Sequence, residues 1–321
     1  MKKILVLEGN PALQKTLVFQ HLRHGEVNRA ASLRLYTGGK GTNFCRAGGL
    51  FGHAEHALCH FTGGENGRRA DSLLAREGIN VFSVETEAET RCCVTCLSAE
   101  DGSMTELIEP SSPLTLEAQK AFLALLEEKI PSYDAVAVAG SLPDGTDPEF
   151  YTRWAEVALK NGKLLFVDAV KGIRNALALS GRKVLKINKE ELLSLSGEKE
   201  TLPGMETLLK QYALDLLAVT DGPFDAFLCT ASGTRKRYFL PKLEKIVSPL
   251  GCGDTASAVF CALLLEGVSP EEAFRRALSA ACANCLCADA ATFRTEDMER
   301  LLPLVRMTDM DTANKGDSSN A

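Results

Sequence analysis

Five short apolar runs recur along the chain, and longer segments with helical periodicity separate them. The runs are ILVL at 4–7, AVAVA at 135–139, LLFV at 164–167, VLKI at 184–187 and DLLAV at 215–219. A strand that is apolar throughout has to be covered on both faces, which is typical of a parallel sheet with helices on either side. The sequence therefore predicts an α/β protein built on a central parallel sheet.

Helix boundary signals fit this plan. Asp147 and Pro148 open a predicted helix that ends at Gly162. The segment SPEE at 269–272 is a capping box with proline at the first helical position.

The segment 93–109 differs from the rest of the chain. It contains two alternating runs around Asp101-Gly102, which is a strong hairpin signal. A hairpin inside a series of strands and helices indicates a small flap or lid. Its alternation leaves one apolar face that a two-stranded ribbon cannot bury alone.

Charge and composition exclude several classes of protein. The net charge is -6 with no cluster of Lys and Arg, which argues against a nucleic-acid or anionic-membrane surface. The N-terminal apolar run of ILVL is too short for a signal peptide or a membrane span. Eleven cysteines without a secretion signal favour a reducing cytoplasm. The polar tail 311–321 is predicted to be disordered.

Two cysteine spacings resemble zinc half-sites, Cys93-x-x-Cys96 and Cys282-x-x-Cys285. The first lies in an alternating segment, where an odd spacing sends side chains to opposite faces of a strand. The second lies in a predicted helix of small residues, where cysteine packs as a small apolar group. We therefore expect no metal site there, and the odd spacing of His53 from both His56 and His60 gives the same expectation for these histidines.

The glycine-rich segment TGGKGTNFCRAGGLFG at 37–52 is neither of the common phosphate loops. Arg34 stands where the first Walker glycine would be, and Phe44 replaces the third glycine of the dinucleotide fingerprint. The segment still offers close backbone approach, Lys40, Asn43 and a helix N-terminus that favours an anion. A plain glycine turn would explain the glycines but not these two side chains.

A second segment, SPLGCGDTASAVF at 248–260, places Gly251, Cys252 and Gly253 before a predicted helix that begins near Asp254. The free N–H groups of such a turn can hold a transferring phosphoryl group, and the carboxylate can take a hydroxyl proton. The alternative is a glycine turn with Asp254 as the helix cap. The two glycine-rich segments together favour the functional interpretation.

The pair GGKGTN and GCGD resembles the two signatures of the PfkB (ribokinase-like) carbohydrate kinases, and the resemblance covers the whole chain except the tail. GNPALQKTL, GEVNRA, MTELIE and GSLPDG are similar to the tagatose-6-phosphate kinase and 1-phosphofructokinase branch. The resemblance implies a ribokinase-like α/β domain over 1–310, a mostly parallel sheet, and lid strands inserted at about 11–36 and 88–110. It also implies ATP and Mg²⁺ as cofactors, a sugar-phosphate acceptor, and a homodimer formed through the lid strands.

The resemblance assigns the chemistry to named positions. The catalytic base falls on Asp254, and the anion hole falls on the backbone amides of Gly251, Cys252 and Gly253. The acceptor-binding positions are Gln14, Gly38, Gly39, Lys40, Asn43, Arg91 and Ser141. Lys40 and Arg91 are the only cations that it places near the acceptor, and cations suit a phosphate. A solvated surface charge is the alternative for each of these two.

On the nucleotide side, the N-x-x-E motif that orders Mg²⁺ through water falls on Asn188 and Glu191. The remaining nucleotide-binding positions are Lys186, Thr220, Gly222 and, on a helix that would form an adenine wall, Asn284.

Three positions depart from the family pattern. Gln14 replaces an acid, so a sugar hydroxyl meets an amide that can donate as well as accept. Ser248 replaces Asp or Asn, so we predict no monovalent-cation site. Asp225 replaces a glycine, and aspartate tolerates the left-handed conformation that this position would then require. Two alternatives stay open: a kinase of an unphosphorylated sugar or nucleoside, and a non-catalytic sugar-phosphate or nucleotide binder of the same fold.

Overall fold

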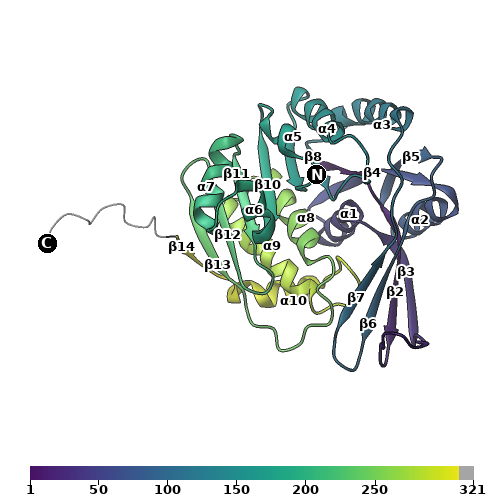
Figure 1. Cartoon of the computed structure of the whole chain (residues 1–321). Helices are drawn as coiled ribbons and strands as arrows, with labels where there is room; N and C mark the ends of the chain where they lie inside the picture. Colours follow the sequence, from purple (N-terminus) through teal and green to yellow (C-terminus); the bar gives the residue numbers. More distant parts are fainter. Residues whose placement is uncertain (311–321) are drawn as a thin grey trace.

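The computed structural model describes residues 1–310, and the tail 311–321 lies outside the described residues. Ten strands form the main sheet in the order β14-β13-β12-β11-β10-β9-β8-β1-β4-β5 (Figure 1). Their bounds are β1 Lys2–Glu8, β4 Ala54–Gly63, β5 Asn80–Thr86, β8 Ala135–Ala139, β9 Leu164–Asp168, β10 Lys183–Asn188, β11 Leu216–Thr220, β12 Asp225–Thr230, β13 Arg235–Phe239 and β14 Arg306–Asp309.

The sheet is parallel from β5 to β11 and antiparallel from β11 to β14. Each of the five apolar runs lies in a parallel strand, so the predicted α/β class is confirmed. The sequence analysis did not identify β4, whose polar residues interrupt the apolar pattern, nor the antiparallel edge.

Helices cover both faces of this sheet (Figure 1). The helices packed on one face are α1 Lys40–Phe51, α2 Gly64–Arg76, α8 Cys252–Leu265, α9 Pro270–Asn284 and α10 Thr295–Leu301. Those on the other face are α3 Leu116–Lys129, α4 Glu149–Lys160, α5 Arg174–Ala178, α6 Lys189–Ser196 and α7 Thr201–Gln211. Along β1, Ile4 and Val6 enter the first core while Leu5 and Leu7 enter the second, because successive side chains of a strand point to opposite faces.

The predicted helix boundaries are confirmed. α4 ends at Lys160 and is followed by Gly162, whose φ of 69° is the left-handed conformation that ends helices. Ser269 caps α9 by accepting a hydrogen bond from the amide of Glu272, and Pro270 is the first helical residue.

Four strands form a separate small sheet in the order β3-β2-β6-β7, which extends from the main body at one end of the molecule (Figure 1). Their bounds are β2 Ala12–Phe19, β3 Ser32–Gly38, β6 Cys92–Ser98 and β7 Met104–Ile108. β6 and β7 pair antiparallel, and Gly102 has a φ of 69° in the turn between them, so the predicted hairpin is confirmed. Every residue of β7 is exposed.

All eleven cysteines are free thiols. Within residues 1–310 there is no group of three or more His, Cys, Asp or Glu side chains that could hold a metal ion. His60 is buried and contacts Asp71 at 2.9 Å.

Among residues 1–310, no helix combines the length and the apolar character that crossing a membrane requires.

Candidate active site

The GGKGTN segment forms the start of α1, where it meets the end of β1. The carboxylate of Glu8 accepts hydrogen bonds from the amide of Gly41 at 3.0 Å and from the hydroxyl of Thr42 at 2.8 Å. Gly39 has a φ of 132°, and a Cβ there would lie 1.9 Å from Oε1 of Glu8. The glycine is therefore required for a buried carboxylate to reach the helix N-terminus. Burial raises the pKa of Glu8 above its ordinary value.

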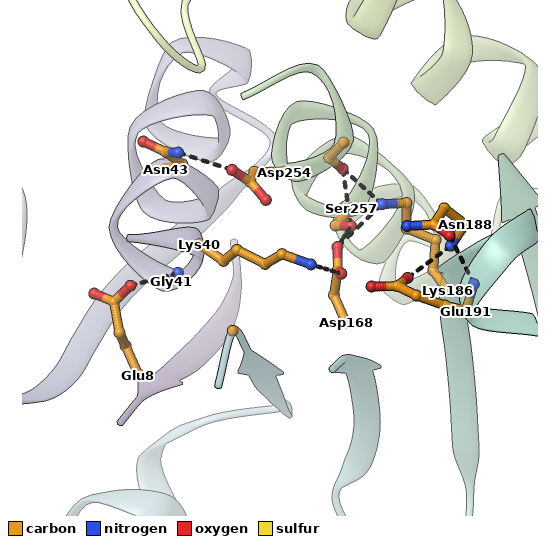
Figure 2. A network of polar contacts seen from close by, with 12 residues as sticks. Glu8, Lys40, Gly41, Asn43, Asp168, Lys186, Asn188, Glu191, Asp254 and Ser257 are labelled. Atoms are coloured by element: carbon orange, nitrogen blue, oxygen red, sulfur yellow. Dashed lines mark hydrogen bonds and ion pairs between the residues drawn. The ribbon is translucent and has the colours of Figure 1, made fainter. Parts of the chain in front are cut away.

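The GCGD segment forms the start of α8, with Gly251 as its N-cap at a φ of 77°. A Cβ on Gly251 would lie 2.3 Å from the amide nitrogen of Ala291, so glycine is again the residue that fits. Asp254 lies one turn further on, so it is not the N-cap. Its Oδ2 instead accepts a hydrogen bond from Nδ2 of Asn43 at 2.8 Å, across the contact between α8 and α1 (Figure 2).

Asp168, the last residue of β9, is the centre of the polar network. It is 3% exposed, and its oxygens lie 3.0 Å from Nζ of Lys40 and 3.0 Å from Nζ of Lys186. The hydroxyl of Ser257 donates to the same carboxylate at 2.5 Å, and Figure 2 shows these groups converging below α8. Burial alone would raise the pKa of Asp168, but the two ammonium groups outweigh it and hold that pKa well below its ordinary value. The ion pair with Asp168 in turn raises the pKa of Lys40.

Asp254 has the opposite electrostatic environment. Burial is the largest effect on its carboxyl group, and the negative charge of Asp168 adds to it. Lys40 and the hydrogen bond from Asn43 oppose this only in part, so the pKa of Asp254 is raised to about 6. A carboxylate with such a pKa is ionised at neutral pH and more basic than an ordinary aspartate, as a general base should be.

A cavity of about 660 Å³ opens beside this network at the carboxyl ends of the parallel strands. Its lining includes Glu8, Lys40, Arg91, Ser141 and Glu191. A larger hollow of about 980 Å³ lies on the other side of α1, but neither Lys40 nor Arg91 lines it, and Asp254 lines neither of the two. The chemistry, and not the size, therefore identifies the candidate site.

The cavity contains more cations than the sequence analysis expected. Lys171 and Arg174 line it together with Lys40 and Arg91, so the expectation of only two cations is wrong. Lys171 pairs with Asp144, while Arg174 donates a hydrogen bond to the carbonyl of Leu195. Lys171 lies in the loop after β9 and Arg174 is the first residue of α5. Neither belongs to a glycine-rich signature, and only the fold brings them to the cavity.

The side chain of Arg91 donates a hydrogen bond from Nη2 to the carbonyl of Asn10 at 3.1 Å, and its backbone carbonyl accepts one from the amide of Leu13 at 2.9 Å. Its Nε is buried and has no hydrogen-bond partner among residues 1–310. Gln14 lies on β2, donates to the hydroxyl of Thr95 at 2.9 Å and packs against Gly38, where a Cβ would lie 2.9 Å from that of Gln14.

The predicted nucleotide-binding residues other than Asn284 lie on or directly after β10 and β11, whereas Asn284 is the last residue of α9. Asn188 and Glu191 form a capping box at the start of α6, with bonds of 2.8 and 2.9 Å. Thr220 is the register partner of Asn188 on β11, and Gly222 follows it with a φ of 56°. Asn284 is fully buried and bonds the hydroxyl of Thr255 and the carbonyl of Leu250, so its side chain holds the GCGD turn in place.

The expectation of a left-handed conformation at Asp225 is wrong. Asp225 begins β12, does not have a positive φ, and pairs with Arg237. Because Asp225 is already part of the extended strand, its backbone does not need the conformational freedom of a glycine. Ser248 is buried, and its hydroxyl accepts a hydrogen bond from the amide of Leu250 at 3.3 Å.

Comparison with protein families decides what this arrangement is. The model of the pfkB family of carbohydrate kinases matches residues 14–297, which include both glycine-rich segments and the whole polar network apart from Glu8. The chain belongs to the pfkB family. It is therefore a carbohydrate kinase, and the resemblance seen in its two signatures is confirmed.

Two curated relatives of this pfkB kinase cover nearly its full length. It is 25% identical to a tagatose-6-phosphate kinase of Staphylococcus epidermidis over 316 residues, covering 96% of this chain and 100% of the relative. It is 27% identical to an ATP-dependent 6-phosphofructokinase isozyme 2 of Mycobacterium tuberculosis over 307 residues, covering 94% of this chain and 89% of the relative.

Solved structures show that the fold is ribokinase-like. A phosphofructokinase-2 mutant from Escherichia coli has a TM-score of 0.87 at 23% identity, covering 95% of this chain and 99% of that one. A possible 1-phosphofructokinase from Thermotoga maritima has a TM-score of 0.83 at 17% identity, covering 96% and 100%.

Sequence analysis missed several residues of the network in this pfkB kinase. Glu8 and Asp168 each follow an apolar run directly, as ILVLE and LLFVD. An acid at that point lies at the carboxyl edge of a parallel sheet, where ligands of such folds bind, and this signal could have identified both. Ser257 and Arg46, whose guanidinium donates to Oδ1 of Asn43 at 2.8 Å, lie inside helices, and no sequence pattern marks them.

Proposed function

We propose that this pfkB kinase transfers a phosphoryl group from ATP to a sugar phosphate of the ketohexose class. The observation that carries the proposal is the buried Asp254, whose pKa is raised to about 6 beside the start of α8. A pure binding protein has no need of a base at that position. A cavity lined by cations completes the argument, because it suits an acceptor that already carries a phosphate.

The residues of this chain divide the reaction between them. Asp254 takes the proton from the acceptor hydroxyl as that oxygen attacks the terminal phosphorus. The backbone amides at Gly251, Cys252 and Gly253 stabilise the charge on the transferring group, since the first N–H groups of a helix have no partner within it. The amide of Cys252 donates only a long hydrogen bond of 3.4 Å to the carbonyl of Pro249, which it exchanges for a phosphoryl oxygen. Lys40 lines the cavity and pairs with Asp168, so its ammonium group can stay close to the phosphoryl group while that group moves from ATP to the acceptor.

The nucleotide and its Mg²⁺ are assigned to the ends of β10 and β11. Mg²⁺ prefers oxygen ligands and keeps most of its waters, and Asn188 and Glu191 supply an amide and a carboxylate oxygen, with Glu191 in the cavity wall. Since the capping box already engages the single side-chain oxygen of Asn188 and one of the two of Glu191, the residues fit an ion that is held through water. When bound, Mg²⁺ neutralises charge on the phosphates. Lys186, which donates to the carbonyl of Gly253 at 3.0 Å, fixes the turn that faces them.

Arg91 is assigned to the phosphate of the acceptor. Its buried, unpartnered Nε and its place on the cavity wall support this role, with Lys40, Asn43, Ser141 and the Gln14 amide around the sugar. The names of the two curated relatives point to the same class of acceptor. The candidates are fructose-1-phosphate, fructose-6-phosphate and tagatose-6-phosphate.

The small sheet is assigned the role of a lid, formed by strands within about 11–36 and 88–110 of a single kinase domain over 1–310. A lid that closes over the cavity excludes water from the reaction. Leu33 and Leu107 lie on the same face of this sheet and are 59% and 57% exposed, which supports a homodimer in which two lids cover each other. The free thiols are consistent with work in a reducing cytoplasm.

A panel of acceptors tests the proposed function. Purified protein is given Mg-ATP with each of the three ketohexose phosphates, with fructose, and with a nucleoside, and the release of ADP is measured. We expect kcat/KM for one ketohexose phosphate to exceed that for fructose by at least about 100-fold, because charge-assisted contacts to the extra phosphate contribute roughly 1.5–3 kcal/mol each. Turnover of fructose or the nucleoside alone would move the assignment to a kinase of an unphosphorylated acceptor. Binding without turnover of any acceptor would indicate a non-catalytic protein.

A further inference from the structure

Two thiols meet at the catalytic turn. The Sγ atoms of Cys252 and Cys285 lie 3.1 Å apart, although the residues are 33 positions apart in the sequence. Cys252 is the first residue of α8, and Cys285 directly follows the last residue of α9. Both are partly exposed, whereas Cys261 and Cys282 on the same two helices are buried.

The surrounding hydrogen bonds hold these thiols in contact. The carbonyl of Cys285 accepts from the amides of Val247 at 2.8 Å and Ser248 at 3.3 Å. The neighbouring Asn284 bonds Thr255 and the carbonyl of Leu250, at 2.8 and 3.0 Å. These hydrogen bonds join the end of α9 to residues on both sides of Cys252, and they hold the backbones that carry the two thiols close together.

We propose that Cys252 and Cys285 form a reversible disulfide when a hydroperoxide is present, and that this disulfide switches the kinase off. The sequence contains no pairing signal for it, because the two cysteines belong to different motifs. The contact exists only because α8 and α9 pack as an antiparallel pair that ends at the catalytic turn.

The chemistry balances with the hydroperoxide as the only oxidant. The two thiols share a hydrogen bond in which either sulfur can donate, and with Cys252 as the donor it lowers the pKa of Cys285 below its ordinary value. The Cys285 thiolate attacks one peroxide oxygen and becomes a sulfenic acid while the O–O bond breaks; with hydrogen peroxide, the other oxygen leaves as water. The sulfur of Cys252 then attacks the sulfenic sulfur, its proton leaves with the hydroxyl group as a second water, and the S–S bond forms. The two thiols lose two electrons and two protons in total, and an excess of a dithiol reverses the oxidation.

The disulfide would disturb the anion hole directly. An S–S bond is about 2.05 Å long, so the sulfur atoms have to approach by about 1 Å. Gly251 cannot follow freely, because it is packed against the backbone of Ala291. The amides of Cys252 and Gly253 therefore rotate away from the position of the phosphoryl group. A misplacement of about 1 Å in a catalytic site can cost roughly 100-fold in rate, and we expect kcat to fall by about ten- to a hundredfold.

The test has one readout that does not depend on catalysis. Reduced full-length protein is treated with hydrogen peroxide, alkylated and digested with trypsin without reduction. Cys252 lies on the tryptic peptide 246–275 and Cys285 on 277–294. We expect these peptides to be joined, and kcat to fall in parallel and to recover with dithiothreitol. The rate measurement rests on the proposed function, whereas the peptide map does not, so the failure of one is distinguishable from the failure of the other.

Two variants assign the link. Cys285→Ser keeps a hydroxyl in place of the thiol and touches no proposed ligand, so we expect normal basal kcat and resistance to peroxide. Cys287→Ser is the matched control on the same peptide, and we expect it to stay sensitive. If Cys285→Ser does not fold, the peptide maps of the unmodified chain and of Cys287→Ser still show whether peptides 246–275 and 277–294 become linked. The proposal is overturned if the two peptides stay unlinked, if the link persists in Cys285→Ser, or if linked protein keeps its full kcat.

Discussion

Nδ2 of Asn43 donates a hydrogen bond to Oδ2 of Asp254 across 2.8 Å, joining two motifs that lie 211 residues apart in the sequence. The other end of the same amide is fixed as well, because its Oδ1 accepts from the guanidinium of Arg46 at 2.8 Å. Arg46 also pairs with Glu77 and donates to the carbonyl of Thr37 at 2.9 Å. The amide of Asn43 therefore has one orientation, and that orientation supports the ionised form of Asp254.

Replacing the base tests the mechanism most directly. We expect Asp254→Asn to fold and to bind Mg-ATP, while kcat falls by at least about 100-fold, the low end of the loss when a general base is removed. Steady-state kinetics and calorimetry of ATP binding measure the two effects. Near-native turnover in this variant would rule out Asp254 as the base.

The pH dependence follows from the raised pKa of Asp254. The base acts only when it is ionised, so activity is present above a pH of about 6 and is lost as the pH falls through that value. We expect log kcat/KM to fall by one for each further pH unit below about 6. An ordinary aspartate would place this acidic limb near 3.9, and a limb there would contradict the assignment.

Arg46 acts on the base only through Asn43, as a positioning residue. In Arg46→Gln, Asn43 loses its fixed orientation, so the hydrogen bond that favours ionised Asp254 weakens and the pKa of Asp254 rises. A hydrogen bond worth about 0.5–1.5 kcal/mol moves the acidic limb of kcat/KM upward by roughly 0.5 to 1 in pH. Glu77→Gln is the control, because it removes an outer partner of Arg46 and leaves Asn43 in place. If Arg46→Gln lowers the melting temperature but leaves the acidic limb of kcat/KM at the same pH, Arg46 has only a structural role.

Arg91 is expected to select for a phosphorylated acceptor. In Arg91→Ala one charge-assisted contact of roughly 1.5–3 kcal/mol is lost, so KM for the sugar phosphate rises by about ten- to a hundredfold. KM for ATP is expected to stay nearly constant, because the proposed nucleotide site lies on the other side of the GCGD turn. Arg68→Ala, on the exposed surface of α2, serves as the control. An unchanged acceptor KM would favour a free sugar or nucleoside as the substrate.

The exposed lid surface predicts a homodimer. We expect light scattering to give twice the chain mass, and Leu107→Glu to shift the protein to monomer, since the substitution places a charge in the face that Leu107 shares with Leu33 and that two copies would bury. Leu116→Glu replaces a leucine that is 60% exposed at the start of α3, away from the lid, and should leave the dimer intact. A monomeric mass for the unmodified protein at assay concentration would contradict the prediction.

Sequence patterns predicted the parallel core and the hairpin well, for a physical reason. A strand buried on both faces has to be apolar along its whole length, as in 135–139, and a short hairpin turn favours residues such as Asp101-Gly102, where Gly102 has a positive φ. β4 was missed because His56 and His60 interrupt its apolar pattern, although the fold buries His60 beside Asp71. The alternation of polar and apolar residues cannot predict that a polar side chain such as His60 is buried, because the hydrogen-bond partner that makes burial possible lies on another element.

The sequence by itself determined the class of fold, the two glycine-rich signatures and Asp254, because backbone freedom and helix starts are local properties. Only the tertiary structure decided which groups set the chemistry of that aspartate. Asp168, Lys186 and Asn43 come from three different elements, and their charges and hydrogen bonds reach Asp254 only where β9, β10 and α1 meet α8. The contact between Cys252 and Cys285 has the same origin, since through-space distances depend on packing that no local pattern encodes.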